Sequence, residues 1–266
     1  IVEGFEADVA ALSLEADITR IVKAGLITHD WKAGTYKGIV SDSVVAFAVR
    51  KGNPKGIKDW ADLAQPGLEV LTPNVKTSGG AMWNILALVG AAKRGQVSGV
   101  TKDDDAAASE FLLSVLNNVT VMDKGARESI TNFEKGVGDV AITYENEVLV
   151  GQMAGQDYEL VIPSSTILIE NPVAVIDTYA DKHGTREVAE AFVNFLLGKE
   201  AQEVFAKYGL RSVDQSVAQA TADKYPAVPD LFTIEFFGGW DAATPALFGE
   251  QGMYTLTVAK VSRLNQ

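Results

Sequence analysis

Segments with the pattern of β-strands and segments with the pattern of helices alternate along almost the whole of this 266-residue chain. Short apolar runs such as residues 43–49, 119–122 and 140–144 are each followed by a stretch whose apolar side chains recur every three or four positions. This alternation is typical of proteins in which helices flank a sheet that contains parallel strands. The sequence therefore predicts an α/β fold.

Two later segments carry expectations of their own. A long helix is expected over residues 185–208, with a weak point at Gly198 because glycine is a poor helix former. Its periodicity predicts four inward-facing apolar residues: Val188, Phe192, Phe195 and Val204. Residues 160–163 and 166–169 are expected to form a strand pair, and residues 254–261, which alternate weakly, a final strand.

The charge balance excludes several classes of partner. The chain carries 23 Lys and Arg against 35 Asp and Glu, which gives a net charge of −12. Nucleic acids and anionic membrane surfaces are bound through basic faces, so neither is expected as a partner. Without cysteine the chain has no disulfide and no thiolate ligand. No stretch approaches the ~20 apolar residues of a membrane helix, which predicts a soluble protein.

The most informative local feature is Ser78-Gly79-Gly80, which follows a predicted strand and opens a predicted helix. The first turn of a helix has unpaired N–H groups and a partial positive charge, and it can hold an anion without a cationic side chain. Glycine lets the anion approach the backbone closely. Ordinary helix capping by Ser78 or Thr77 accounts for the same residues, so both interpretations stay open.

A second strand-to-helix junction lies at Gly125-Ala126-Arg127. Two such junctions favour a common cleft. Arg127 is expected to form an ion pair with Asp123 or Glu128 instead of contacting an anion. Tyr144 ends a predicted strand, where it could either donate a hydrogen bond into the cleft or serve as a core aromatic.

Residues for catalysis are scarce. The two histidines, His29 and His183, lie in polar, turn-like contexts, which argues against a catalytic triad or a histidine-rich metal site. Glu145 and Glu147 are two residues apart and would point away from each other on a helix. Residues 78–80 match neither the P-loop nor the dinucleotide fingerprint. A binding protein with no catalytic residues, metal or cofactor is therefore predicted.

Several ordered segments resemble one known family, the sulfate- and thiosulfate-binding proteins of ABC importers. The matching stretches are GNPKGIKDWADL at 52–63, LTPNVKTSGGAMWN at 71–84, DKGAR at 123–127, GDV at 138–140 with YENE at 144–147, GTREVAEA at 184–191, and LFTI at 231–234 with FGGW at 237–240. They follow the family order from residue 2 to about residue 240.

The resemblance implies a type II periplasmic-binding-protein fold, in which two lobes, each a mixed sheet flanked by helices, are joined by crossover strands near residues 44–49 and 166–169. Residues 1–45 plus 168–266 would form the first lobe and residues 46–167 the second. By the same resemblance, sulfate is held by uncharged donors of Ser78, Gly79, Gly80, Ala126 and Tyr144. The residues that surround these contacts would be Thr77, Gly125 and Arg127.

Three departures from the family pattern accompany the resemblance. Tyr144 aligns with a tryptophan that donates to the anion, and Met82 stands where the family has arginine. Family members also begin with a strand, a helix and a second strand that precede the position of Ile1 and supply further donors. On the resemblance this N-terminal segment is expected to be missing, with weaker binding as the consequence.

The resemblance therefore implies a monomeric, periplasmic or exported solute-binding subunit that delivers its anion to the transmembrane subunits of an ABC permease; an organelle-facing importer would use the same chemistry. Sulfate and thiosulfate are both tetrahedral dianions, and the sequence does not separate them. The alternative is a scaffold of the same fold that has lost its ligand and acts through protein contacts.

Overall fold

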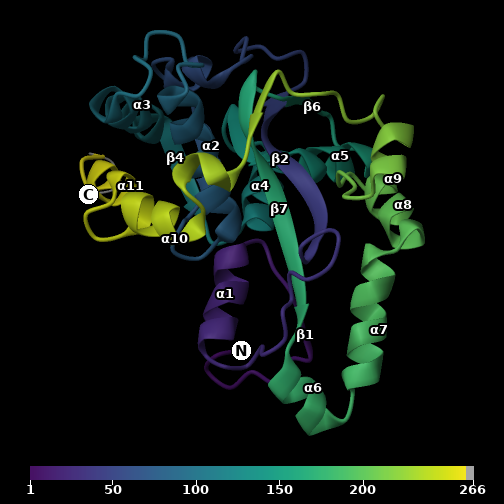
Figure 1. Ribbon diagram of the computed structural model, residues 1–266. Helices are drawn as coiled ribbons and strands as arrows, with labels where there is room; N and C mark the ends of the chain where they lie inside the picture. The colour runs from purple at the N-terminus through teal and green to yellow at the C-terminus, as the bar shows by residue number, and fades with distance from the viewer. Residues whose placement is uncertain (262–266) are drawn as a thin grey trace. The chain divides into compact units, whose positions relative to one another are not determined.

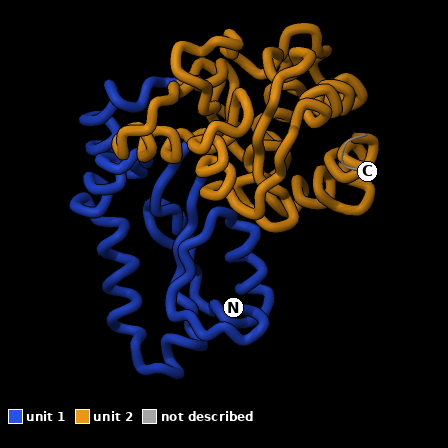
Figure 2. The backbone as a smooth tube through the Cα atoms, turned by 180° about the vertical axis from the view of Figure 1, so that it is seen from behind, with its two compact units in different colours: residues 1–43, 169–227 blue, residues 44–168, 228–266 orange. Residues whose placement is uncertain are grey.

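The computed structural model describes residues 1–261, which form two compact units (Figures 1 and 2). Unit 1 comprises residues 1–43 and 169–227, and unit 2 comprises residues 44–168 and the described residues from 228 onward. Strands β2 (Ile39–Arg50) and β7 (Ser165–Val175) each run from one unit into the other, and they contain both segments expected to be crossovers. Helices and strands alternate as predicted, which confirms the α/β class.

The sheet of unit 2 has a parallel and an antiparallel part. Strand β3 (Val70–Pro73) pairs in parallel with both β4 (Val119–Asp123) and β5 (Val140–Tyr144). Strand β2 runs antiparallel to β5 and to β6 (Tyr158–Val161). The expected pairing of residues 160–163 with 166–169 was therefore wrong, because the hydrogen bonds of β6 go to β2.

Helices cover this sheet and enclose the core of unit 2. They are η1 (Trp60–Ala64), α2 (Gly79–Lys93), α3 (Asp105–Asn118), α4 (Ala126–Glu134) and α5 (Glu145–Met153). Helix α2 begins at Gly79 as predicted and is buried on nearly every side, because it packs on β3, β5 and α3. The largest fully buried side chains include Phe47, Trp60, Trp83 and Phe133.

The C-terminal segment also belongs to unit 2. It forms β8 (Asp230–Phe232), η2 (Ile234–Phe237), α10 (Trp240–Ala243), the π-helical turn η3 (Thr244–Phe248) and α11 (Met253–Val258). Strand β8 pairs with β7, and the ring of Trp240 meets that of Trp83 edge-on at 4.8 Å.

This placement differs from the expected first lobe, which included residues 228–266. The expected strand over residues 254–261 was wrong as well, because Tyr254 and Thr257 lie three residues apart on a helix and are both buried. The Thr257 hydroxyl lies 2.9 Å from that of Ser109 on α3.

Unit 1 is built around the short strand β1 (Val9–Ala11), which is antiparallel to β7. Its helices are α1 (Glu15–Lys23), α6 (Asp177–His183), α7 (Arg186–Leu197), α8 (Lys199–Lys207) and α9 (Gln215–Ala220). In the core of this unit, Ala10, Ile18, Ile21 and Ile27 pack with Ala174 of β7 and with Ile176, which directly follows β7. Within residues 1–261 no helix is both long and apolar enough to cross a membrane.

The long helix expected over residues 185–208 is divided into α7 and α8 at Gly198, whose extended backbone (φ −77°, ψ 154°) ends one helix and starts the next. The predicted inward residues were wrong. Val188, Phe192, Phe195 and Val204 are 72%, 49%, 51% and 48% exposed, whereas Ala189 is buried. Helix α7 has apolar residues on more than one side, so periodicity alone did not identify the face that packs.

Candidate functional site

The carboxyl ends of the parallel strands of unit 2 carry the starts of three of its helices. Strand β3 leads through residues 74–78 into α2, β4 leads through residues 124–125 into α4, and β5 leads directly into α5. Because these strands are parallel, the helix N-termini lie at the same edge of the sheet, the usual place for a ligand in such folds. Each N-terminus contributes unpaired N–H groups and a partial positive charge.

Ser78 is the N-cap residue of α2. Its backbone is extended, and its Oγ accepts a long hydrogen bond of 3.4 Å from the N–H of Ala81. The capping role that the sequence left open is therefore present. A hydroxyl that accepts a hydrogen bond keeps its own proton for donation, so capping does not prevent Ser78 from donating to an anion. Gly79 and Gly80 are the first two residues of the helix.

Gly125 occupies the N-cap position of α4 without a side chain to offer, and no side chain caps this helix within the part of the chain that the structure describes. Ala126 is its first residue. The N–H of Ser129 bonds to the carbonyl of Gly125 at 3.1 Å, which starts the regular helix one turn later. The first turn of α4 is therefore open to an external acceptor.

Gly80 is where the predicted contact residues meet. A methyl group built on Gly80 would lie 3.4 Å from Ser78 Oγ, 3.4 Å from Ala126 Cβ and 3.4 Å from Tyr144 Cε1. Residues from three separate strand-to-helix junctions thus surround a position that has no side chain. Tyr144 is the last residue of β5, pairs with Val45 of β2 and is 9% exposed. It is at once a largely buried aromatic and a neighbour of the α2 N-terminus.

Arg127 does not join this group. Its guanidinium pairs with Glu147 at 3.0 Å, and the side chains are 62% and 13% exposed respectively. An ion pair was expected, but the expected partners, Asp123 and Glu128, were wrong, because α5 places a partly buried carboxylate beside α4. Burial raises the pKa of Glu147, while the charge of Arg127 acts in the opposite direction. The positive charge of Arg127 is thus paired with the carboxylate of Glu147 and is not one of the predicted anion contacts.

Thr77 and Asn74 organise the loop before α2. The Thr77 hydroxyl donates to the carbonyl of Lys124 at 2.7 Å, and the carbonyl of Asn74 accepts from the N–H groups of Thr77 and Ser78 at 3.1 and 3.0 Å. The predicted neighbour Thr77 therefore connects the loop before α2 to the loop before α4.

Asn84 was not identified from the sequence. Its side-chain amide donates to Thr72 Oγ1 at 3.1 Å and to the carbonyl of Ile142 at 2.9 Å, which fixes α2 against β3 and β5. The signal was available, since Asn84 is a polar residue within the most uniformly apolar helix of the chain. The start of α5 was missed too, although two acids in its first turn are a common feature of helix N-termini.

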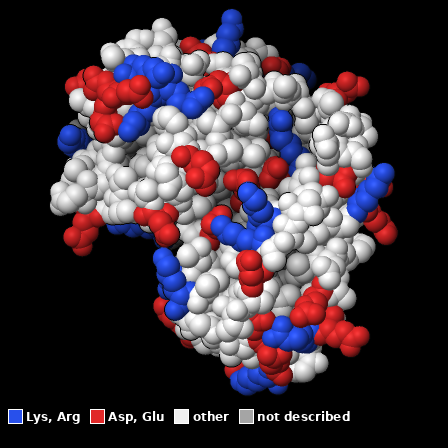
Figure 3. All heavy atoms as spheres, in the orientation of Figure 1, with Lys and Arg blue, Asp and Glu red and all other residues white. Residues whose placement is uncertain are grey.

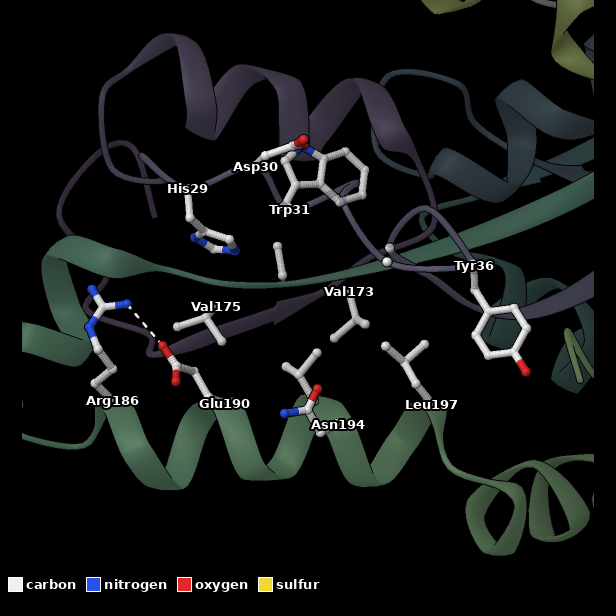
Figure 4. A pocket seen from close by; sticks show the side chains of 14 residues that line it. His29, Asp30, Trp31, Tyr36, Val173, Val175, Arg186, Glu190, Asn194 and Leu197 are labelled. Carbon is white, nitrogen blue, oxygen red and sulfur yellow. Dashed lines mark hydrogen bonds and ion pairs between the residues drawn. The ribbon is translucent and has the colours of Figure 1, made fainter.

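A separate cavity of about 340 Å³ lies within unit 1 (Figure 4). Val173 and Val175 of β7 and Leu197 of α7 project into it, and none of the predicted anion-binding residues lines it. Arg186 at its edge is bound by Asp177, Asp181 and Glu190. A cation neutralised by three carboxylates is a poor anion receptor, so this cavity is not the predicted site.

Comparison with known proteins identifies a family for this chain. Residues 1–211 match the family model for bacterial extracellular solute-binding proteins. The sulfate-binding protein of Synechococcus elongatus is 44% identical over 96% of this chain and 71% of its own length, and that of Escherichia coli is 42% identical over 96% and 77%. The thiosulfate-binding protein of E. coli is 36% identical over 95% and 75%.

Among solved structures, the sulfate-binding protein SubI from Mycobacterium tuberculosis aligns with a TM-score of 0.86 at 41% identity, over 93% of this chain and 83% of that one. The chain belongs to the family of bacterial extracellular solute-binding proteins.

Proposed function

We propose that this protein binds sulfate, a fully ionised tetrahedral oxyanion, at the N-termini of α2 and α4 and serves as the solute-binding component of an ABC importer. The observation that carries the proposal is the convergence of Ser78, Ala126 and Tyr144 around Gly80. The proposed donors are the Ser78 and Tyr144 hydroxyls and the N–H groups of Gly79, Gly80 and Ala126.

The absence of charge from this set of donors accounts for selectivity. A site in which backbone N–H groups, which can only donate, supply most of the contacts suits an anion without protons, because every oxygen of such an anion can accept. Protonated phosphate would turn an O–H toward one of these donors, and such an unpaired contact costs about 1–3 kcal/mol. We therefore expect sulfate to bind more tightly than phosphate at neutral pH.

The relatives favour sulfate over thiosulfate. The sulfate-binding relatives named above are 42% and 44% identical to this chain, compared with 36% for the thiosulfate-binding one. Since the two anions share charge and shape, this preference rests on relatedness and not on a contact. The family also supports export from the cytoplasm and transfer of the ligand to a permease, and we expect a monomer.

The net charge of −12 does not oppose this role. On the face in Figure 3, acidic and basic side chains are interspersed. The local potential at a helix N-terminus is set by nearby backbone dipoles and falls off within the first turn. A negative protein can therefore hold a dianion in a pocket of N–H groups.

Isothermal titration calorimetry with sulfate, thiosulfate, molybdate and phosphate tests the proposal. We expect heat with sulfate, little with phosphate, and a sulfate affinity that is constant between pH 6 and 8, because sulfate stays a dianion there and the proposed donors are backbone N–H groups and hydroxyls. Absence of heat and of a thermal shift with all four anions would contradict the proposal and support the alternative, a scaffold of this fold that acts through protein contacts.

A further inference from the structure

The loop before α2 and the loop before α4 are joined by two hydrogen bonds. The N–H of Asn74 donates to the carbonyl of Asp123 at 2.8 Å, which extends the parallel pairing of β3 and β4 beyond Pro73. The Thr77 hydroxyl donates to the carbonyl of Lys124 at 2.7 Å, across 47 residues of sequence. The bond between Thr77 and Lys124 lies beyond the last paired residues of β3 and β4, where the sheet no longer fixes the distance between the two backbone segments.

The position of the Thr77 bond is close to the proposed donors. Thr77 is separated from Gly79 by Ser78 alone, and Lys124 is separated from Ala126 by Gly125 alone. The turn around Asn74 is held by its own hydrogen bonds, including one from the N–H of Lys76 to Asn74 Oδ1 at 2.9 Å. Because both loops are short and the loop before α2 is internally bonded, we expect a change at the Thr77–Lys124 contact to be transmitted to the first turns of α2 and α4.

We propose that Thr77 is a positioning residue that sets the spacing between the N-termini of α2 and α4 and thereby the size of the oxyanion that the site prefers. This inference rests on the proposed function. Thr77 does not contact the anion; it acts through the backbone of Lys124. The N–H groups at the starts of α2 and α4, held at a fixed separation, fit an anion of one size. Loss of the bond between Thr77 and Lys124 lets this separation vary.

The test compares sulfate with selenate, which has the same charge and shape but longer bonds to oxygen. Thr77→Val removes the hydroxyl and keeps the branched shape, and Thr77→Ser keeps the hydroxyl. Loss of one neutral hydrogen bond changes an equilibrium by roughly threefold to tenfold. We expect Thr77→Val to weaken sulfate binding by roughly that factor and selenate binding by less, so that the preference for sulfate falls.

Thr131→Val is the matched control. The Thr131 hydroxyl also donates to a backbone carbonyl at 2.7 Å in an exposed position, but its acceptor is Arg127 within the same helix. The preference for sulfate should be unchanged in Thr131→Val and retained in Thr77→Ser. A purely structural role for Thr77 would lower the melting temperature and weaken both anions alike, leaving their ratio constant.

The outcomes separate the inference from the function on which it rests. If the unsubstituted protein binds neither anion, the proposed function fails and the role of Thr77 falls with it. If the unsubstituted protein binds sulfate and Thr77→Val leaves the ratio of the two affinities unchanged, only the role of Thr77 is overturned. Thr77→Ala, which removes the same hydroxyl with less crowding, is judged by the same ratio if the valine variant does not fold.

Discussion

Ser78 combines two roles that can be separated by substitution. Its Oγ caps α2 by accepting from Ala81, and its proton is proposed to be donated to sulfate. Aspartate is also among the best N-cap residues, but it accepts only and carries a negative charge. Replacing Ser78 by aspartate therefore keeps the cap and removes the donor.

We expect Ser78→Asp to leave the free energy of unfolding within about 0.5 kcal/mol of the original value, because the two residues cap equally well. Sulfate binding should be lost, as measured by calorimetry. The reciprocal change Asp104→Ser, at the N-cap of α3, is the control and should alter neither quantity appreciably. Undiminished sulfate binding by Ser78→Asp would mean that Ser78 only caps the helix.

At the residue scale, the sequence predicted which backbone positions begin helices better than which side chains meet. Gly79 and Ala126 were identified correctly as helix starts because a small residue after an apolar run is a local signal. The partner of Arg127 was not, because Glu147 comes close only when α4 and α5 pack on the same sheet. Asn84, similarly, acquires its role only through contacts with β3 and β5.

Among the elements, the C-terminal segment is attached to unit 2 by a compact cluster of polar and aromatic contacts. Arg94, the C-cap residue of α2, binds both carboxylate oxygens of Asp230, and the Ser165 hydroxyl donates to the same carboxylate at 2.7 Å. The guanidinium also lies 5.2 Å from the ring centre of Phe232. The hydrogen bond from Arg94 lowers the pKa of Asp230, so its carboxylate is charged across the neutral range.

We expect Asp230→Asn to lower the free energy of unfolding by about 2–3 kcal/mol, because a partly buried arginine loses its charged acceptor. Urea denaturation measures the loss, and limited proteolysis should show earlier cleavage between residues 228 and 261. The neighbouring pair of Lys93 and Asp105 supplies the control, since the Asp105 side chain is 70% exposed. Asp105→Asn should cost less than about 1 kcal/mol, and an equal effect of the two substitutions would contradict the prediction.

The elements that were predicted incorrectly share a physical cause. Residues 253–258 form the helix α11 because Tyr254 and Thr257 are buried in unit 2, where α11 packs on α3, and the weak alternation over residues 254–261 does not encode that neighbour. The exposed apolar side of α7 was chosen wrongly because both sides of the helix carry apolar residues. Strong, local patterns, such as the start of α2, were predictable, whereas the choice between two packing partners was not.

On the scale of the whole molecule, one buried carboxyl group makes stability depend on pH. Asp42 lies on β2 in unit 1, and its backbone bonds to that of Arg211 in both directions, at 2.9 and 2.8 Å. Within the described residues its buried Oδ1 has no hydrogen-bond partner. Burial, and then the charge of Glu170, raise the pKa of Asp42 to about 7 from an ordinary value of 3.8, while Arg211 opposes the shift.

Since the folded state holds this proton more tightly than the unfolded chain, the stabilising contribution is complete below the unfolded pKa. It is lost as pH rises through the folded value. We expect the melting temperature to fall between pH 5 and pH 7, with a contribution from Asp42 of up to about 1.4 kcal/mol per pH unit. His183, whose pKa is raised by Asp8 and Glu6, acts in the same direction, so the measurement is the difference between the protein and Asp42→Asn.

Asp42→Asn should make the melting temperature depend less on pH and should stabilise the protein at pH 8. Glu170→Gln should reduce this dependence in part, because one of the two causes of the shift is removed. Asp157→Asn is the control, because the side chain of Asp157 is 71% exposed. Its melting temperature should change with pH in the same way as that of the original protein. Parallel curves for Asp42→Asn would instead show that other groups account for the slope.

The return of the chain to unit 2 also constrains how the protein is made. Residues 44–168 are the first part of unit 2 to be synthesised, residues 169–227 of unit 1 follow, and the segment that contains Asp230 and Trp240 is synthesised only after that. Until that moment Trp83 has no Trp240 against its ring, and Arg94 has no Asp230 to bind. Domains generally fold as units during translation, whereas the last described segment of unit 2, residues 228–261, is made only after residues 169–227 of unit 1. The packing around Trp83 and Arg94 is therefore completed only after all of unit 1 has been synthesised.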